Sequence, residues 1–595
     1  MATADNTRTP VIIASYDPNS AGGPKASSKD LPMERGLVRY DDTADTRPCF
    51  SSAWVEDSSS EGFGLLRSYD VSGVPVRLWA RGDSGLGLYA IHPPEYKLNP
   101  RHIRALAEAM AEIVSRMPGD IELASLEIVR PYIKAKAKDL LYSRLVAQQD
   151  GSVDSHEVDI EADRLSEILS KYTAGYGILE TLLEDDLVQD IFVDSPSSHA
   201  PVQVVLRSEA HQSVRQKCRT NVFLGRRDLK AIVSRVKLET GLPFSEANPV
   251  LEADLRRLDC RITIVGPPLS ERGVAIAIRK HARNIWTMPS LIANDTLSPL
   301  LSAFLWACAI GRRTVLIAGS RGSGKTTLLG ALMLEFPLTQ RVVVIEDTPE
   351  IPTRRMQELG FDIQPLRFSQ GGSRQNISAD DALRVSLRMG ESAIVVGEVR
   401  GQEARLLYES MRAGSAGSAV LGTIHGNSAR GVLDRAIEDL GISERAFSST
   451  DLIVVMGLLR APDGSRFQRR ISEVAEVRYE KSGISIAGLF SMENGSSCAS
   501  PTSIFSDGCQ TMKNIGQSLG CGSERMMAIV KARAHADQLY SELVNRQSSS
   551  RSPEEMRLRS NEVLTGLLFS SDDPETGLRR WREWFDAENG KVNSE

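Results

Sequence analysis

The spacing of apolar and polar residues separates the first part of the chain into a tail and a helical region. Residues 1–62 are rich in Ser, Asp, Pro, Thr and Gly and contain few large apolar side chains, which is typical of a disordered or variable tail. Apolar residues then recur at helical spacing over 101–114, 126–146 and 160–172. We therefore expect residues 63–175 to be mostly helical.

Apolar runs of a different kind predict a small α/β domain in the next segment. Short β-branched runs, each typical of a strand, lie at 190–194, 202–206, 261–265 and 274–279. A helical pattern over 228–240 lies among them. These elements predict a domain at 176–283, followed by a polar linker at 284–296 that contains Pro289. Because a few linker residues can absorb a rotation between domains, the part from Ile285 to Ser290 is expected to act as a hinge.

Buried-type strands alternate with helical patterns in the third part of the chain. The strands are predicted at Thr314–Ile317, Val342–Ile345, Ala393–Val396 and Ala419–Thr423. This alternation is typical of a parallel sheet with crossover helices, which we place at 297–494. Residues 495–595 begin with a Ser- and Gly-rich stretch and then return to helical patterns, which predicts a C-terminal helical extension.

Composition narrows the classes of protein to which the chain can belong. The net charge of -6 and the pI of about 5.9 provide no overall positive field for nucleic acid, so no nucleic-acid partner is expected. No apolar run reaches the roughly 18 residues that a membrane helix needs, and the N-terminus lacks the apolar core of a secretory signal. The seven cysteines are scattered and form no C-x-x-C pair. A cytoplasmic protein is expected.

One loop carries a strong chemical signal. The residues between the strand at Thr314–Ile317 and the following helical pattern have the spacing of a phosphate-binding loop, with nucleotide-binding candidates Gly319, Ser320, Arg321, Gly322, Ser323, Gly324, Lys325, Thr326 and Thr327. Backbone N–H groups and a helix N-terminus can surround phosphates there. Lys325 would reach the β- and γ-phosphates, and the hydroxyl of Thr326 would bind Mg²⁺. The sequence therefore predicts ATP or GTP binding.

Polar side chains follow three of the other predicted strands. Glu346 and Asp347 end one strand, and Glu350 follows them past a proline. Glu398 ends the next strand and could take part in a Mg²⁺ site directly or through water. His425 lies between small residues at the end of the last strand. Each of these features alone is also compatible with an ordinary solvated strand end. Ligands of open α/β sheets bind at this edge, so together they predict a shared site.

In this order, the phosphate loop and the motifs I-E-D-x-x-E, V-G-E-V-R and T-I-H-G resemble the secretion ATPase superfamily. These are the hexameric motors of type II secretion, type IV pili, type IV secretion and archaeal surface filaments. The resemblance runs from about Ile178 to Glu476, and the sequence of Leu387–Gly401 is most similar to the archaeal branch. Many bacterial members have Pro-Asp where this chain has Glu391-Ser392. The resemblance implies a RecA-like P-loop motor domain, preceded by a smaller PAS-like α/β domain, with ATP and Mg²⁺ as ligands.

The resemblance also implies roles for individual residues. Glu350 would be the catalytic glutamate that positions water, Glu398 would act at the magnesium, and His425 would sense the γ-phosphate. Further arginines would approach the nucleotide or a subunit junction. Arg279 and Arg261 would do so from the N-terminal α/β domain, and Arg384 and Arg388 would lie at the junction. Independently of the resemblance, Arg400 after the strand that ends at Glu398 could pair with a carboxylate or reach phosphate.

By the same resemblance the chain is expected to be an ATP-hydrolysing hexameric motor at the cytoplasmic face of the membrane. It would act on a polytopic membrane platform protein and, through it, on pilin-like subunits of an archaeal type IV pilus-like filament, or in type II/IV secretion. A conjugation or effector-secretion ATPase would share the same motifs. A small-molecule P-loop kinase and a nucleotide-dependent scaffold without turnover are the alternatives from other classes.

Overall fold

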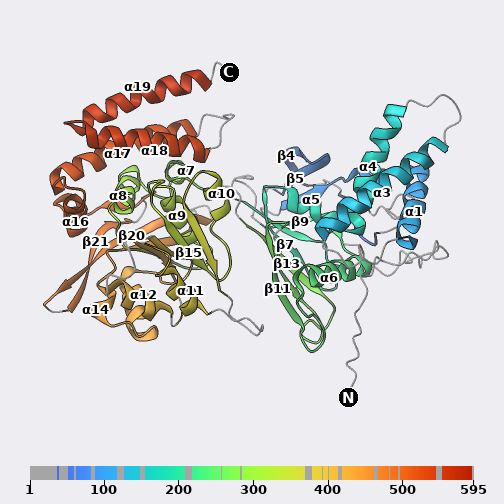
Figure 1. Ribbon diagram of the computed structural model, residues 1–595, viewed down its shortest axis with the longest axis horizontal. Helices are drawn as coiled ribbons and strands as arrows, with labels where there is room; N and C mark the ends of the chain where they lie inside the picture. Colours follow the sequence, from blue (N-terminus) through green and yellow to red (C-terminus); the bar gives the residue numbers. More distant parts are fainter. Residues whose placement is uncertain are drawn as a thin grey trace. The chain divides into compact units, whose positions relative to one another are not determined.

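The computed structural model describes most of the chain and divides it into two compact units, Met1–His281 and Ala282–Glu595. The described residues are 37–38, 51–58, 62–81, 87–116, 126–147, 155–207, 217–255, 257–281, 285–368, 378–390, 393–399, 401, 403–412, 419–460, 467–481, 483–493, 496–544 and 553–592. Figure 1 shows their helices and strands.

The first unit is built on a nine-stranded sheet in the order β11-β12-β13-β7-β8-β9-β6-β5-β4. Its strands are β4 (Gly64–Val71), β5 (Val74–Ala80), β6 (Gly87–Ile91), β7 (Val188–Val193), β8 (Gln203–Leu206), β9 (Lys217–Thr220), β11 (Val250–Leu255), β12 (Cys260–Val265) and β13 (Ala275–Lys280). Its helices are α1 (Pro100–Ser115), α3 (Leu126–Ala147), α4 (Ser155–Thr173), α5 (Ile178–Glu184) and α6 (Arg226–Thr240), with a 3-10 turn η2 (Pro94–Lys97). Two short pairs, β1 (Leu37–Val38) with β3 (Asp57–Ser58) and β2 (Trp54–Val55) with β10 (Val222–Phe223), complete it.

Two expectations for the N-terminal region need correction. The described residues of 63–175 form the expected helices α1, α3 and α4 after Pro100, but strands β4, β5 and β6 precede these helices and join the sheet of the small α/β domain. The predicted tail also ends before residue 62, because Ala53 and Val55 are buried in the core of this unit.

The second unit has a mostly parallel sheet, whose strand order is β16-β15-β17-β18-β14-β19-β20-β21-β22. Its strands are β14 (Val315–Gly319), β15 (Val342–Glu346), β16 (Ile363–Arg367), β17 (Ala393–Val396), β18 (Val420–Ile424), β19 (Leu452–Arg460), β20 (Phe467–Glu480), β21 (Gly483–Ser491) and β22 (Ser500–Pro501). Its helices are α7 (Met288–Ala293), α8 (Pro299–Ile310), α9 (Lys325–Met333), α10 (Thr353–Glu358), α11 (Ala379–Ser386), α12 (Glu403–Arg412), α13 (Ala429–Asp434), η3 (Arg435–Asp439), α14 (Glu444–Phe447), α15 (Ser503–Ser506), α16 (Gln510–Ser518), α17 (Ser523–Val544), α18 (Pro553–Ser570) and α19 (Pro574–Val592).

The strands from β16 to β19 in that order are parallel, and β20, β21 and β22 continue the sheet antiparallel. All five residues of β14 are buried, because helices cover both faces of the sheet. Val315 and Ile317 belong to the core on one face, and Leu316 and Ala318 to the core on the other, as the alternation of a strand requires. This explains the continuous apolar runs from which these strands were predicted.

The C-terminal helices pack onto one face of this unit. In Figure 1, α17 and α18 lie next to α7 and α8, and α19 covers them from outside. Met526, Ile529 and Val530 share one hydrophobic core with Phe304 and Trp306 of α8. The predicted extension is therefore part of the compact body of the second unit.

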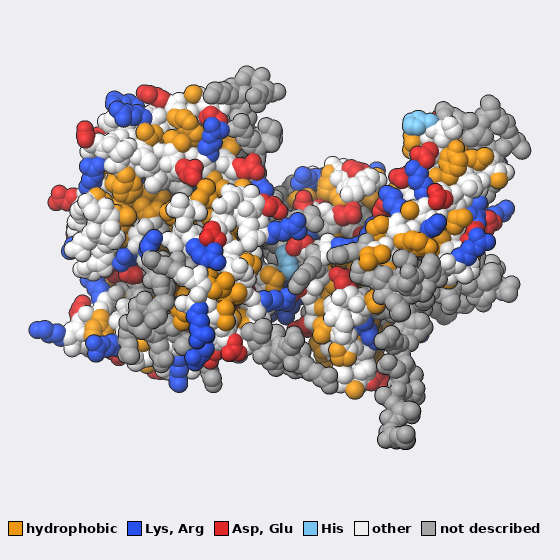
Figure 2. Space-filling model, viewed as in Figure 1, with side chains coloured by type: hydrophobic (Ala, Val, Ile, Leu, Met, Phe, Trp, Pro, Cys, Tyr) orange, Lys and Arg blue, Asp and Glu red, His pale blue; other side chains and the backbone are white. Residues whose placement is uncertain are grey.

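Four buried charges join the C-terminal helices to the helix that follows the phosphate loop. Glu335, two residues beyond the end of α9, accepts hydrogen bonds from Arg533 at 2.9 Å and Arg557 at 2.8 Å. Arg557 also bonds Asp537 at 2.8 Å, and the hydroxyl of Ser302 donates to Asp537 at 2.7 Å. The side chains of these four residues are at most 1% exposed. They differ in this from the acidic and basic side chains that Figure 2 shows mixed on the surface.

The segment that was expected to be a hinge is held in the second unit. Ile285 and Met288 are buried in its core, and α7 begins at Met288. The backbone N–H of Ile285 donates to the carboxylate of Glu554 at 3.0 Å. A rotation about Ile285–Ser290 would break these contacts, so the structure does not favour a hinge there.

The buried charges predict a large effect of one neutral substitution. Glu335→Gln leaves Arg533 and Arg557 with a single carboxylate between them, and the free energy of unfolding should fall by about 3–5 kcal/mol. Urea unfolding measures this change. The control is Glu358→Gln, since Glu358 is half exposed and pairs with the 92% exposed Arg354. Its effect should stay below about 1 kcal/mol. Equal losses in the two variants would contradict the prediction.

Candidate functional site

The phosphate loop connects β14 to α9 in a conformation that depends on glycine. Gly322 and Gly324 have φ angles of 78° and 97°, in the left-handed region. A Cβ on Gly319 would collide with the hydroxyl of Ser323 and would lie 2.6 Å from the carbonyl oxygen of Met456. Ser323 is fully buried, and its hydroxyl oxygen has no hydrogen-bond partner among the described residues. The glycines therefore let the loop backbone approach a bound phosphate group closely, and the buried hydroxyl of Ser323 provides a polar group beside it.

Lys325 opens α9 and folds back over the loop. Its ammonium group donates to the carbonyl oxygens of Gly319 and Ser320, each at 3.0 Å. Burial lowers the pKa of Lys325, while the carboxylates of Glu398 and Glu350 act in the opposite direction. Both carboxylates therefore stabilise the protonated form of Lys325 against the effect of burial.

The acidic turn after β15 reaches the loop through Thr326. The hydroxyl of Thr326 donates to the carboxylate of Glu350 at 3.0 Å. Glu346 at the end of β15 is 7% exposed and accepts hydrogen bonds from the backbone N–H groups of Glu350 and Ile351, each at 3.1 Å. Glu346 thus fixes the backbone that carries Glu350.

Glu398 and His425 meet across the ends of β17 and β18. The His425 Nε2 atom lies 2.9 Å from Glu398 Oε1. The hydroxyl of Thr423 donates to the carbonyl oxygen of Gly397 at 2.5 Å, which ties the two strand ends together. Gly397 has no space for a side chain, since a Cβ there would lie 2.8 Å from the Cγ of Glu346. The three polar strand ends that were expected to converge are therefore adjacent at this edge of the sheet.

The remaining predicted arginines are distributed over both units. In the first unit, Arg279 bonds Asp190 at 2.9 Å and Arg261 bonds Glu252 at 3.1 Å. In the second unit, Arg384 and Arg388 are exposed at the end of α11 and just after it. The predicted candidate Arg400 lies outside the described residues.

The sequence reasoning missed Arg469 on β20. Its Nε–H donates to the carbonyl oxygen of Gly322 in the phosphate loop at 3.0 Å. Strand β20 comes far later in the chain than the loop, and only the pairing of β19 with β14 and β20 brings them together. The adjacent arginines 469 and 470 in a strand pattern were the available signal, but they do not identify a partner.

The residues around the phosphate loop fit a nucleotide with bound Mg²⁺. No group of three or more His, Cys, Asp or Glu side chains that could hold a metal alone occurs in the described part of the chain. Mg²⁺ is commonly bound by one or two protein ligands together with phosphate oxygens and water. Thr326 and Glu398 could supply the protein ligands. The backbone of the loop and Lys325 suit the phosphates.

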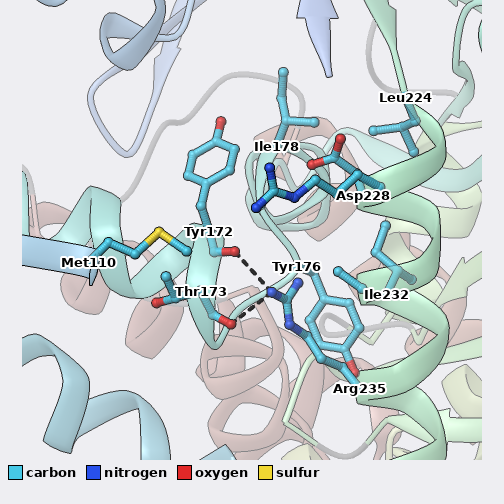
Figure 3. Close-up of a pocket in the computed structure, with 12 residues that line it drawn as sticks. Met110, Tyr172, Thr173, Tyr176, Ile178, Leu224, Asp228, Ile232 and Arg235 are labelled. Atoms are coloured by element: carbon cyan, nitrogen blue, oxygen red, sulfur yellow. Dashed lines mark hydrogen bonds between the residues drawn. The ribbon is translucent and has the colours of Figure 1, made fainter. Parts of the chain in front are cut away.

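A small cavity in the first unit is a separate feature (Figure 3). Tyr172, Tyr176, Asp228 and Arg235 line it, among others, and the guanidinium of Arg235 donates to the carbonyl oxygens of Tyr172 and Thr173 at 2.9 and 2.8 Å. Its volume of about 20 Å³ is enough for about one water molecule. Small-molecule sites are typically about 300–1,000 Å³, so this cavity is no nucleotide site.

Comparison with known proteins adds a family assignment. The sequence model of the type II/IV secretion system protein family matches residues 174–564, about two thirds of the chain. An uncharacterised protein of Methanocaldococcus jannaschii is 32% identical over 261 residues, which cover 43% of this chain and only 35% of that protein. A Mycobacterium tuberculosis protein assigned to conjugal transfer is 27% identical over 338 residues, which cover 56% of this chain and 92% of that protein.

Secretion proteins and solved ATPase structures also match. Type IV secretion system protein PtlH of Bordetella pertussis is 34% identical over 210 residues, covering 31% of this chain and 60% of PtlH. The ATPase DotB of Legionella pneumophila is 17% identical, covers 51% of this chain and 80% of DotB, and gives a TM-score of 0.36. The pilus retraction motor PilT with bound ADP is 19% identical, covers 64% of this chain and 95% of PilT, and gives a TM-score of 0.35. No described helix is long and apolar enough to cross a membrane.

Glu346 predicts a pH dependence of stability. Burial raises its pKa from 4.5 to about 8. The neighbouring acids Glu350 and Asp347 raise this pKa further, and the hydrogen bonds from the two backbone N–H groups oppose the rise only in part. The folded protein therefore favours the protonated form. The stabilisation from this group is complete below the unfolded pKa and is lost as pH rises through about 8. Glu346→Gln stays neutral and keeps an acceptor oxygen, so it should lack this loss.

Urea unfolding of the original chain and of Glu346→Gln between pH 5 and 9 tests this prediction. The free energy of unfolding of the original chain should fall relative to the variant up to about pH 8 and then run parallel to it. Glu358→Gln serves as the control at an exposed carboxylate. Parallel curves for Glu346→Gln over the whole range would contradict the prediction.

Proposed function

The chain belongs to the type II/IV secretion system protein family, and we propose that it is an ATP-hydrolysing hexameric motor of this family. The observation that carries the proposal is the convergence on one phosphate loop of Lys325, Glu350, Glu398 and His425, which come from four different strand ends. A nucleotide-binding protein without turnover needs the loop and a magnesium ligand such as Glu398, but it has no need of a carboxylate that activates water, the role we assign to Glu350.

The chemistry follows from the positions of these side chains. Lys325 and the loop backbone neutralise phosphate charge, and the hydroxyl of Thr326 together with Glu398 holds Mg²⁺, directly or through water. Glu350 orients the attacking water or accepts its proton, and Glu346 holds the Glu350 backbone in place. His425, paired with Glu398 at 2.9 Å, is the contact that registers loss of the γ-phosphate.

The roles of the arginines and the assembly belong to the same proposal. Arg279 and Arg261 are the further candidates for contact with phosphate, since positive charge stabilises the transferring phosphoryl group. Six copies form a ring, with Arg384 and Arg388 at the junction of neighbouring copies. The ring acts at the cytoplasmic face of the membrane on a polytopic platform protein and lifts pilin-like subunits into an archaeal pilus-like filament.

A type IV secretion or conjugation motor is the second candidate. It is favoured by the Mycobacterium tuberculosis relative assigned to conjugal transfer, of which 92% is covered by the match, and by PtlH. Neighbouring genes distinguish the two: pilins favour the filament, whereas a relaxase and channel proteins favour conjugation.

The first experiment is ATP hydrolysis per subunit as a function of protein concentration. The rate should rise steeply with concentration, because a ring completes sites that a single copy lacks. Glu350→Gln keeps the size of the side chain but removes the base, and the rate should fall by about 10²–10⁴-fold. Glu358→Gln, at a half-exposed position of α10, should hydrolyse ATP at the original rate.

Two results would contradict the proposal. Hydrolysis that Glu350→Gln does not change would remove Glu350 from the catalytic role. Nucleotide binding without turnover at any concentration, with and without the platform protein, would favour the scaffold instead of the motor.

A further inference from the structure

Arg469 lies on the opposite side of the phosphate loop from the acidic residues. In the strand order of the sheet, β15, β17 and β18 lie on one side of β14 and carry Glu346, Glu398 and His425 at their ends. Strands β19 and β20 lie on the other side. Thr326 of the phosphate loop bonds Glu350 at 3.0 Å, so phosphate hydrolysis is assigned to the acidic side. The opposite side is left for the part of the nucleotide that does not react.

The strand register places Arg469 at the edge of the sheet where ligands bind. Met456 of β19 pairs with Gly319, the last residue of β14. Leu458, two residues farther along β19, pairs with Arg469 of β20. Since β19 is parallel to β14, this pair lies beyond the carboxyl end of β14.

The side chain of Arg469 follows the loop closely. Its Cδ atom would lie 3.3 Å from a Cβ on Gly324, and its Nε–H bonds the carbonyl oxygen of Gly322 at 3.0 Å. The guanidinium carries five N–H donors in all. Among the described residues, Gly322 is the one hydrogen-bond partner found for its side chain. Burial lowers the pKa of Arg469, as expected for a cation partly withdrawn from water and not paired with a carboxylate.

We propose that Arg469 is a nucleotide-binding residue whose terminal N–H groups bind an α-phosphate oxygen while its Nε–H holds the loop. The inference rests on the proposed function for the nucleotide and adds the residue that recognises its non-reacting end. An arginine suits this position because its planar fork can bond the loop carbonyl with one donor and phosphate oxygens with others. A purely structural arginine would only brace the loop.

Binding of nucleoside diphosphates separates these two roles without turnover. In the full chain, Arg469→Gln should weaken ADP binding about tenfold, the loss expected for a hydrogen bond between charged groups. Arg469→Lys keeps the positive charge and should weaken binding less than the Gln variant. The two diastereomers of ADPαS, in which sulfur replaces one or the other α-phosphate oxygen, provide the specific readout. The ratio of their dissociation constants should change in Arg469→Gln.

The control is Arg559→Gln, which removes an arginine from the exposed face of α18, where Arg559 pairs with Glu588. It should leave both the affinity for ADP and the diastereomer ratio unchanged. Thermal unfolding of Arg469→Gln and Arg469→Lys shows whether each variant is folded, and either folded variant suffices for the measurement.

Two results would overturn the inference: unchanged ADP affinity in the folded variants, or an equal loss for both diastereomers, which is what bracing alone would give. These outcomes are distinct from failure of the proposed function. A chain that binds ADP through Arg469 but hydrolyses no ATP contradicts the motor and keeps this inference. A chain that hydrolyses ATP equally well with and without Arg469, with unchanged ADP affinity, contradicts this inference and keeps the motor.

Discussion

The second unit depends on a buried network of two acids and two arginines. Glu335 follows α9, whose first residues are Lys325 and Thr326, so one short helix connects the phosphate loop to the network. Burial alone would raise the pKa of Asp537, but Arg557 and Arg533 hold it below its usual value. Such groups are stable in an apolar interior only when all of them are present together. The C-terminal helices therefore hold the end of α9, the helix that follows the phosphate loop.

The guanidinium of Arg533 adds a second constraint on the same contact. It lies 4.5 Å from the ring centroid of Trp306, which is fully buried in α8. A cation over an indole ring is favourable, and more so away from water. The network thus joins three parts that are distant in the sequence: α8, the end of α9, and the C-terminal helices. Motion of the phosphate loop relative to these helices must take place at the start of α9, since its end is held.

Parts of this architecture could be predicted because local pattern determined them. The parallel strands β14, β15, β17 and β18 are buried on both faces, so each is a continuous apolar run that ends at a polar side chain. Their carboxyl ends share one edge, which is why Glu350, Glu398 and His425 could be grouped from the sequence alone. In contrast, β4 was missed because most of its residues are not buried, so its sequence shows no apolar alternation.

Features that depend on long-range packing could not be predicted. Arg469 reaches Gly322 only through the pairing of β19 with β20, and the sequence does not contain that register. The hinge at 285–290 stays a prediction, but the sequence did not indicate that Ile285 and Met288, which read as members of a polar connector, are buried in the core of the second unit. The partners of Glu335 lie about 200 residues away, and nothing near Glu335 in the sequence indicates them.

The polar groups of the site also bind one another. Lys325 bonds the loop carbonyls, Thr326 bonds Glu350, and Glu398 pairs with His425. Nucleotide binding at this site therefore exchanges hydrogen bonds within the protein for hydrogen bonds to phosphate. An exchange of this kind contributes only about 0.5–1.5 kcal/mol per neutral hydrogen bond, and more where charge is involved. Affinity must then come mainly from the charged contacts. In the proposed motor, the Glu350 carboxylate would become available to water only when the hydroxyl of Thr326 has another partner.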